Sequence, residues 1–307
     1  MANYLVAMAT FACLYALLAL ALNLVWGMAG MINLGLVGFF AVGAYVSALL
    51  TKRGGAPIPV GLAAAFVLAA AAGAVMALVT ARLRGDYLAI ITLGFSEVVR
   101  LVASNEIWLT NGTDGISGIP GPWRGRVSPD AFNAIFLALA ALAVVAALIL
   151  LERLRRAPYG RVLRAIRDDD QVAAVAGKPV MRFKVEAFAL SAGILGVAGA
   201  LWGHYTSFIA PDVFVPLITI YVVLALTAGG TGSNWGAVLG AFLVVSFMEG
   251  TRFVTGWVPG LGPVQVAALR ESLIGVSLLL ILRARPTGLL PEARPRLAGA
   301  PLAESAR

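Results

Sequence analysis

Residues 1–51 contain no Asp, Glu, Lys or Arg; they read MANYLVAMATFACLYALLALALNLVWGMAGMINLGLVGFFAVGAYVSALLT. Further charge-free runs cover 54–81, 131–151, 187–211 and 213–248. A helix needs about 20 mostly apolar residues to cross the hydrocarbon core of a bilayer. These runs are continuous and lack strict alternation, which indicates helices rather than barrel strands. With 60% hydrophobic and 12% charged residues, the chain cannot cover a water-facing surface. The sequence therefore predicts an all-α polytopic membrane protein embedded in the lipid bilayer.

The composition excludes several kinds of site. The chain has one cysteine, Cys13, and one histidine, His204, so a disulfide framework and Cys- or His-rich metal sites are excluded. Acids, bases and metal ligands do not cluster as an enzyme site requires. We therefore expect no catalytic residue, metal or cofactor. The formal net charge of +8 does not indicate nucleic-acid binding, because the basic residues lie where membrane topology places them.

Basic residues set the predicted topology. Nine of the 23 Lys and Arg lie between Arg153 and Lys184, and five more between Arg283 and Arg307. Such residues mark cytoplasmic loops, so we expect about nine transmembrane helices with the N-terminus outside and the C-terminus inside. Lys52 and Arg53 then lie outside, a mild violation of the rule. The expected spans are near 4–26, 34–51, 58–81, 86–104, 131–151, 184–203, 214–230, 236–254 and 269–284. Residues 1–290 form the predicted transmembrane domain with a cytoplasmic loop at 153–184, and 291–307 a disordered cytoplasmic tail.

Two apolar stretches are interrupted by Gly, Pro or Asn: residues 23–35, and the segment from Gly203 through Pro211 and Pro216. Irregular backbone at membrane depth is tolerated only beside protein or a water-filled cavity, and broken or re-entrant segments line the substrate path in transporters. The alternative is that the glycines only allow close helix packing. On the first interpretation, Asn23, Gly30 and Asn33 are candidate pathway residues.

Two charged residues lie in the interior of the predicted fourth span, away from its ends. Glu97 and Arg100 are three residues apart, so they share a helix face. A charge at membrane depth costs roughly 3 kcal/mol and normally faces the bundle interior. Glu97 is therefore a candidate for the substrate pathway or a subunit contact, and a mutual ion pair that only pins the helix is the alternative.

The loop at 153–184 contains a predicted amphipathic helix from Arg161 to Ala176, ended by Gly177 with Pro179 soon after. Such a segment could lie on anionic lipid or dock into a groove of a partner protein. The acidic run at 168–170 favours a partner with mixed charge.

Several motifs together resemble the M-type branched-chain amino acid ABC transporter permeases, a binding-protein-dependent inner membrane component family. The matching stretches cover the chain nearly end to end: LNLVWG at 22–27, GMINLG at 30–35, RLRGDYLAIITLGF at 82–95, NGTDGISGIP at 111–120, PYGRVLRAIRD at 158–168, GGTGSNWG at 229–236 and RPTGLL at 285–290. The segment Gly177-Lys-Pro179 departs from the family pattern.

The resemblance implies a permease that pairs with a sister permease, two cytoplasmic ATPases and a periplasmic binding protein in the bacterial inner membrane. The chain has no phosphate-binding loop of its own, which agrees with ATP hydrolysis on another chain. By carry-over, residues 160–177 would insert into the ATPase. The implied coupling residues are Gly160, Arg161, Arg164, Ala165, Ile166, Arg167, Asp168 and Gly177.

Alternatives remain open. A permease of the same architecture could carry urea, short amides or another small solute. An ion-coupled secondary transporter would need membrane-buried carboxylates, for which only Glu97 and Glu249 qualify. The resemblance favours import of leucine, isoleucine and valine by an ATP-driven system, with a heterodimer of permeases.

Overall fold

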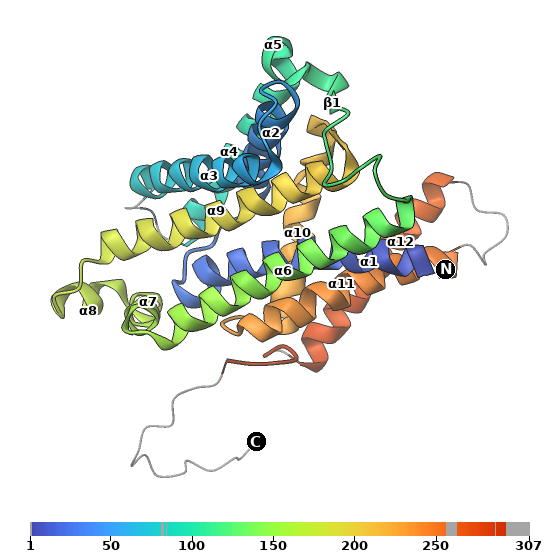
Figure 1. Cartoon of the computed structure of the whole chain (residues 1–307). Coiled ribbons are helices and arrows are strands. Elements are labelled where there is room, and N and C mark those ends of the chain that lie inside the picture. The colour runs from blue at the N-terminus through green and yellow to red at the C-terminus, as the bar shows by residue number, and fades with distance from the viewer. Residues whose placement is uncertain (1, 81–82, 84, 256–262, 286, 293–307) are drawn as a thin grey trace.

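The computed structural model describes residues 2–80, 83, 85–255, 263–285 and 287–292. Its long helices are drawn in Figure 1. They are α1 (Ala2–Leu22), α2 (Leu36–Lys52), α3 (Ile58–Thr80), α4 (Asp86–Asn105), α6 (Pro129–Arg156), α9 (Val180–Thr206), α10 (Pro216–Gly229), α11 (Asn234–Thr255) and α12 (Pro263–Ala284). The shorter elements are the π-helix η1 (Asn23–Met28), α5 (Ile107–Thr110), η2 (Gly112–Asp114), β1 (Ile116–Ser117), α7 (Pro158–Asp168), α8 (Asp170–Val175), β2 (Phe208–Ile209) and η3 (Pro211–Val213).

Six helical segments in the described part of the chain are long and apolar enough to cross a membrane: Asn3–Met28, Ile58–Thr80, Asp86–Asn105, Pro129–Arg156, Val180–Thr206 and Pro211–Gly229. Leu36–Lys52 and Asn234–Gly250 are shorter apolar helices. The prediction of an all-α, multi-pass membrane protein is confirmed. Nine spans and their orientation stay predictions. Of the predicted tail, residues 293–307 lie outside the described residues, whereas Pro291 and Glu292 are described.

Helix α1 lies at the centre of the bundle, between α6, α9 and α11. Leu14, Ala16 and Leu20 are fully buried, as expected for a helix that is apolar on every side. Glycines bring α2 and α9 close together, because a Cβ on Gly43 would overlap the backbone of Gly196. Small residues at such crossings let backbones approach and gain packing contacts within a membrane.

The two ends of the bundle differ (Figure 1): α7 and α8 lie at one end of α6 and α9, and the β1–β2 pair lies at the other. β1 and β2 are antiparallel, with Ile116 opposite Ile209. At this end, buried His204 of α9 contacts both α2 and the loop that follows β1. One of its ring nitrogens lies 2.8 Å from Ser47 Oγ and the other 2.6 Å from the Pro120 carbonyl oxygen. The break predicted from Gly203 to Pro216 is thus confined to residues 207–215, which pack against the loop after α4.

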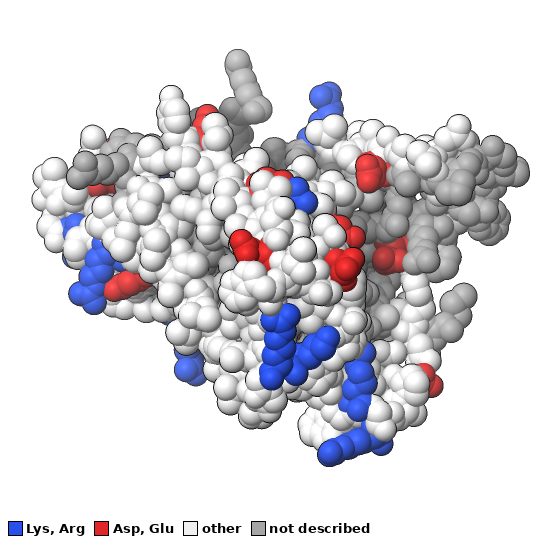
Figure 2. All heavy atoms as spheres, turned by 90° about the horizontal axis from the view of Figure 1, so that it is seen from above, with Lys and Arg blue, Asp and Glu red and all other residues white. Residues whose placement is uncertain are grey.

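The surface suits a lipid environment. On the face shown in Figure 2, most atoms belong to uncharged residues, and charged side chains are confined to a few places. The helices α3, α4 and α6 carry many of the exposed apolar side chains, among them Val75, Ile90, Val98 and Leu142. Large exposed apolar area is unusual for a soluble monomer and is expected where lipid or another subunit covers the helices.

Candidate functional site

The first helix loses its regular geometry at η1. Asn23–Met28 form a π-helix, and residues 29–35 are not helical. Asn23 is fully buried. Its Oδ1 accepts a hydrogen bond from the Gly232 amide at 2.8 Å, and its Nδ2 donates to Asn234 Oδ1 at 2.9 Å. Asn234 Nδ2 in turn donates to Glu152 Oε2 at 3.2 Å. Asn23, a predicted pathway residue, therefore ties η1 to the α10–α11 loop and, through Asn234, to α6.

Glycine is required at position 27 of this network. A Cβ there would overlap the Asn23 side-chain oxygen and lie 2.6 Å from the Gly232 nitrogen. Gly30 has a φ of 71°, in the left-handed region that favours glycine. A Cβ on Gly30 would lie 2.9 Å from Cγ of Arg167. The chain therefore leaves the first helix along a path that only glycines permit.

Arg167 joins helix α7 to this segment. Its Nη1 donates to the Gly27 carbonyl oxygen at 2.5 Å and to Glu292 Oε2 at 2.8 Å. Glu292 Oε1 also lies 4.0 Å from Arg164 Nη1. The Arg167 and Glu292 side chains are 27% and 19% exposed. Arg167, predicted as a contact to a partner, thus points into the chain and binds elements far apart in sequence.

The predicted helix from Arg161 to Ala176 is not continuous, which corrects the sequence interpretation. Asp169 is extended, with φ −158° and ψ 112°, and separates α7 from α8. Its carboxylate accepts hydrogen bonds from the Gln171 and Val172 amides and so caps α8. Asp is a preferred N-cap residue because its side chain satisfies amides left free at a helix start. Gly177, with a φ of 76°, ends α8 as predicted.

Helix α7 has an inner and an outer side. Gly160, Leu163 and Ile166 are buried, and Gly160 sits against the carbonyls of residues 154 and 155. Tyr159 packs on Phe183 with ring centroids 5.2 Å apart. Burial raises the pKa of Tyr159 to about 12, so the folded state favours the neutral phenol. Of the predicted coupling residues, Gly160, Ile166 and Arg167 therefore serve the attachment of α7 within the chain.

The outer side is open. Arg161, Ala165 and Asp168 are exposed, and with α8 they border a hollow of about 500 Å³. Val172 at its edge is 65% exposed, and Val175 in α8 is 91% exposed. Exposed valines flanked by charges of both signs are typical of a protein-docking surface.

The other pathway candidates lie on and beneath α4. Asn33 is buried; its Oδ1 accepts from the Gly35 amide at 2.9 Å, and its Nδ2 has no hydrogen-bond partner among the described residues. The Leu34 amide donates to Thr92 Oγ1 at 3.1 Å, so this segment is held against α4. Glu97 accepts two hydrogen bonds from Arg100 Nε, at 2.9 and 3.1 Å, and is 40% exposed on the outer side of α4.

Comparison with known proteins identifies the family. A sequence profile described as "Branched-chain amino acid transport system / permease component" matches residues 4–282. The chain belongs to this family. It is 35% identical over 311 residues to the high-affinity branched-chain amino acid transport system permease protein LivM of Escherichia coli K12, covering 94% of this chain and 70% of that one. A probable LivM permease of Methanocaldococcus jannaschii is 30% identical, covering 91% of each chain. No solved structure matches significantly.

A sister type of permease is also similar. The LivH permease of Escherichia coli K12 is 25% identical over 296 residues, covering 90% of this chain and 91% of that one. These relatives are named as transport permeases. The present chain is accordingly a membrane permease component of an amino acid transport family and not an enzyme.

Sequence reasoning missed two residues of this permease site. Asn234 lies within the GGTGSNWG stretch at 229–236, but nothing in that stretch indicates its bond to Asn23. Glu292 falls in the predicted disordered tail, and its pairing with Arg167 depends on where the chain returns in space. A carboxylate just beyond the RPTGLL stretch is the only signal that the sequence offers.

Proposed function

We propose that this chain is the M-type permease subunit of an ATP-driven importer of leucine, isoleucine and valine in the bacterial inner membrane. It would work with a sister permease, two cytoplasmic ATPases and a periplasmic binding protein. The family and the names of the relatives support the transport role. The observation that carries the coupling role is the exposed α7–α8 surface, which Arg167 fastens to the first membrane helix.

Contacts at the ends of the helices support the predicted orientation, N-terminus outside and C-terminus inside. Asn3 Nδ2 donates to Asp130 Oδ1 at the start of α6, at 2.6 Å, and Tyr4 donates to Glu249 late in α11. These groups lie at the end of α6 opposite α7 (Figure 1). Glu292, in contrast, contacts Arg167 at the α7 end. If the basic α7 region is cytoplasmic, the N-terminus is outside and Glu292 inside, as nine spans require.

We assign ATPase contact to the outer side of α7 and α8. The hollow there is lined by apolar Val162, Ala165 and Val172 and by the charged residues Arg161 and Asp168. A partner helix or loop with one apolar side chain and mixed charge fits this surface. When the ATPase shifts α7, Arg167 would carry the shift to η1, and residues 31–35 would carry it to α4.

The exposed side of α4 supports contact with the sister permease. Residues 87, 90, 94, 98 and 101 form one exposed stripe, and the partly exposed Glu97 and Arg100 lie beside it. An ion pair at membrane depth costs several kcal/mol against lipid, so protein or water covers this face. Gly94 has no neighbour within 4 Å of a Cβ in this chain. A mid-helix glycine costs about 1 kcal/mol against alanine, and close approach of a second permease explains it.

Uptake by the reconstituted complex tests the transport proposal. Proteoliposomes would hold this chain, the sister permease, the ATPases and the binding protein, and labelled leucine uptake would be measured with and without ATP. We expect ATP-dependent uptake, its loss in Ala165→Arg, and retention in Glu186→Lys, an exposed residue outside the docking surface. Uptake of urea or an amide but not leucine would refute the substrate. Uptake without the ATPases would favour an ion-coupled transporter and refute the whole assignment.

Co-purification tests the α4 contact. We expect Gly94→Leu to reduce recovery of the sister permease at least tenfold, because the added side chain separates the two helices. Ala71→Leu, at an exposed position of α3, is the matched control and should leave recovery unchanged. Equal recovery of both variants would place the sister permease elsewhere.

A further inference from the structure

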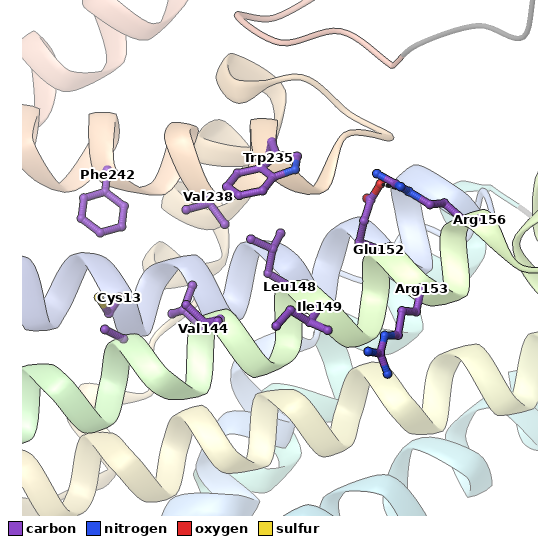
Figure 3. Close-up of a pocket in the computed structure, with 12 residues that line it drawn as sticks. Cys13, Val144, Leu148, Ile149, Glu152, Arg153, Arg156, Trp235, Val238 and Phe242 are labelled. Atoms are coloured by element: carbon purple, nitrogen blue, oxygen red, sulfur yellow. Dashed lines mark hydrogen bonds and ion pairs between the residues drawn. The ribbon is translucent and has the colours of Figure 1, made fainter.

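A lateral groove runs between α6 and α11, with α1 as its floor (Figure 3). Its volume is about 540 Å³, within the roughly 300–1,000 Å³ typical of small-molecule sites. Most of its walls are apolar. Residues that line the groove include Cys13 of α1, Val144 and Leu148 of α6, Trp235 of α11, and Arg153 and Arg156 at one end.

The two walls of the groove are built by regular helix spacing. Trp235, Val238 and Phe242 follow one another at intervals of three and four residues along α11, so they share one face. Val144 and Leu148 face them from α6 (Figure 3). Such a slot is apolar over about two helical turns, a length suited to a hydrocarbon chain rather than to a polar solute.

One end of the groove is positively charged. Glu152 is paired with Arg155 at 2.6 Å and with Arg156 at 2.8 Å. Arg153 has no ion-pair partner in the part of the chain that the structure describes. The net charge of Glu152, Arg153, Arg155 and Arg156 together is +2. Arg156 is 74% exposed, and Trp235, 57% exposed, lies on the facing helix at this end.

We propose that this groove binds one anionic phospholipid. An acyl chain fills the apolar slot, and the phosphate lies against Arg153 and Arg156. Trp235 lies at the level of the headgroup, where tryptophans are enriched in membrane proteins. Basic residues between helices at the membrane surface attract anionic headgroups. The proposal rests on the membrane location of the chain and does not depend on its substrate.

The charges decide in favour of a lipid over a helix of another subunit. A packed helix would bury the arginine end of the groove and would have to supply matching carboxylates there. A phospholipid supplies its negative charge at the membrane surface and its apolar part below, in the order that the groove presents. The arginines also distinguish an anionic lipid from a zwitterionic one, since the latter carries no net charge.

Quenching of Trp235 fluorescence by lipids with brominated acyl chains tests the proposal. The full chain would be reconstituted in phosphatidylcholine with small amounts of brominated phosphatidylglycerol or brominated phosphatidylcholine. The Trp235 signal is the difference between wild type and Trp235→Phe. We expect half-maximal quenching at a mole fraction roughly 30-fold lower for phosphatidylglycerol, since two arginines contribute about 2 kcal/mol at about 1.4 kcal/mol per tenfold change.

Variants separate the parts of the site. Arg153→Gln with Arg156→Gln should abolish the preference, whereas Arg126→Gln with Arg182→Gln changes total charge equally at exposed positions and should retain it. Val145→Phe fills the groove and should weaken quenching by both lipids. Equal quenching by both lipids in wild type would show ordinary surrounding lipid and overturn the proposal. Absence of quenching by either lipid in the assembled complex would show that another subunit covers the groove, which also overturns it.

Discussion

Arg167→Ala tests whether α7 is fastened to the first membrane helix from within the chain. The substitution removes the hydrogen bonds from Nη1 to the Gly27 carbonyl and to Glu292. Hydrogen bonds to charged groups contribute about 1.5–3 kcal/mol, and the side chains of Arg167 and Glu292 are both more than two-thirds buried. We expect the docking of α7 to weaken by about 2–3 kcal/mol, which raises the population of its open state about 30- to 150-fold.

Hydrogen exchange of the reconstituted permease measures this opening. Amides of α7 should exchange about 30- to 150-fold faster in Arg167→Ala, while amides of α9 keep their rates. Arg161→Ala is the matched comparison, because Arg161 lies on the same helix but is exposed. It should leave α7 exchange unchanged and lower only the affinity for the ATPase.

The same contact is expected to couple ATP hydrolysis to transport. In the assembled importer, Arg167→Ala should raise the number of ATP molecules hydrolysed per leucine transported, because α7 then moves without displacing η1. Combined with Glu292→Gln, its effect on α7 exchange should be less than additive, with a coupling energy of about 1 kcal/mol or more. Additive effects, or unchanged exchange together with lost ATPase binding, would refute the internal role and place Arg167 at the ATPase.

Three further outcomes follow from the structure. Gly27→Ala should lower the stability of the permease by about 1–3 kcal/mol in thermal unfolding, since its Cβ would overlap Asn23 and crowd Gly232; unchanged stability would contradict the packing at η1. Asp169→Ala should cost about 1 kcal/mol through the lost cap of α8, detectable as faster exchange in α8 alone, and Asp169→Asn should restore most of it. The raised pKa of Tyr159 means that the folded state favours the neutral phenol. The contribution of this phenol to the free energy of unfolding is therefore complete below the unfolded pKa of about 10 and falls as pH rises toward 12. Tyr159→Phe should make the free energy of unfolding less dependent on pH across that range.

Some features of the site were accessible from the sequence and others were not. The break at Asp169 could have been anticipated, because an aspartate that can cap following amides competes with a continuous helix. The exposed position of Glu97 could not, because helix spacing shows that Glu97 and Arg100 share a face but not which face the bundle covers. Arg164 and Arg167 have the same spacing and the same charge, yet only Arg167 hydrogen-bonds the Gly27 carbonyl.

The sequence by itself determined that the chain is an all-α, multi-pass membrane protein. Charge-free runs such as residues 1–51 lack the alternation of barrel strands, so a helix, which satisfies its backbone hydrogen bonds locally, is the structure they can form in lipid. Tertiary structure alone decided which polar groups meet. Asn23 and Asn234 are 211 residues apart, and Arg167 and Glu292 are 125 apart. Their contacts exist because packing of the helices brings distant segments together, and no local pattern records which buried polar group will find which partner.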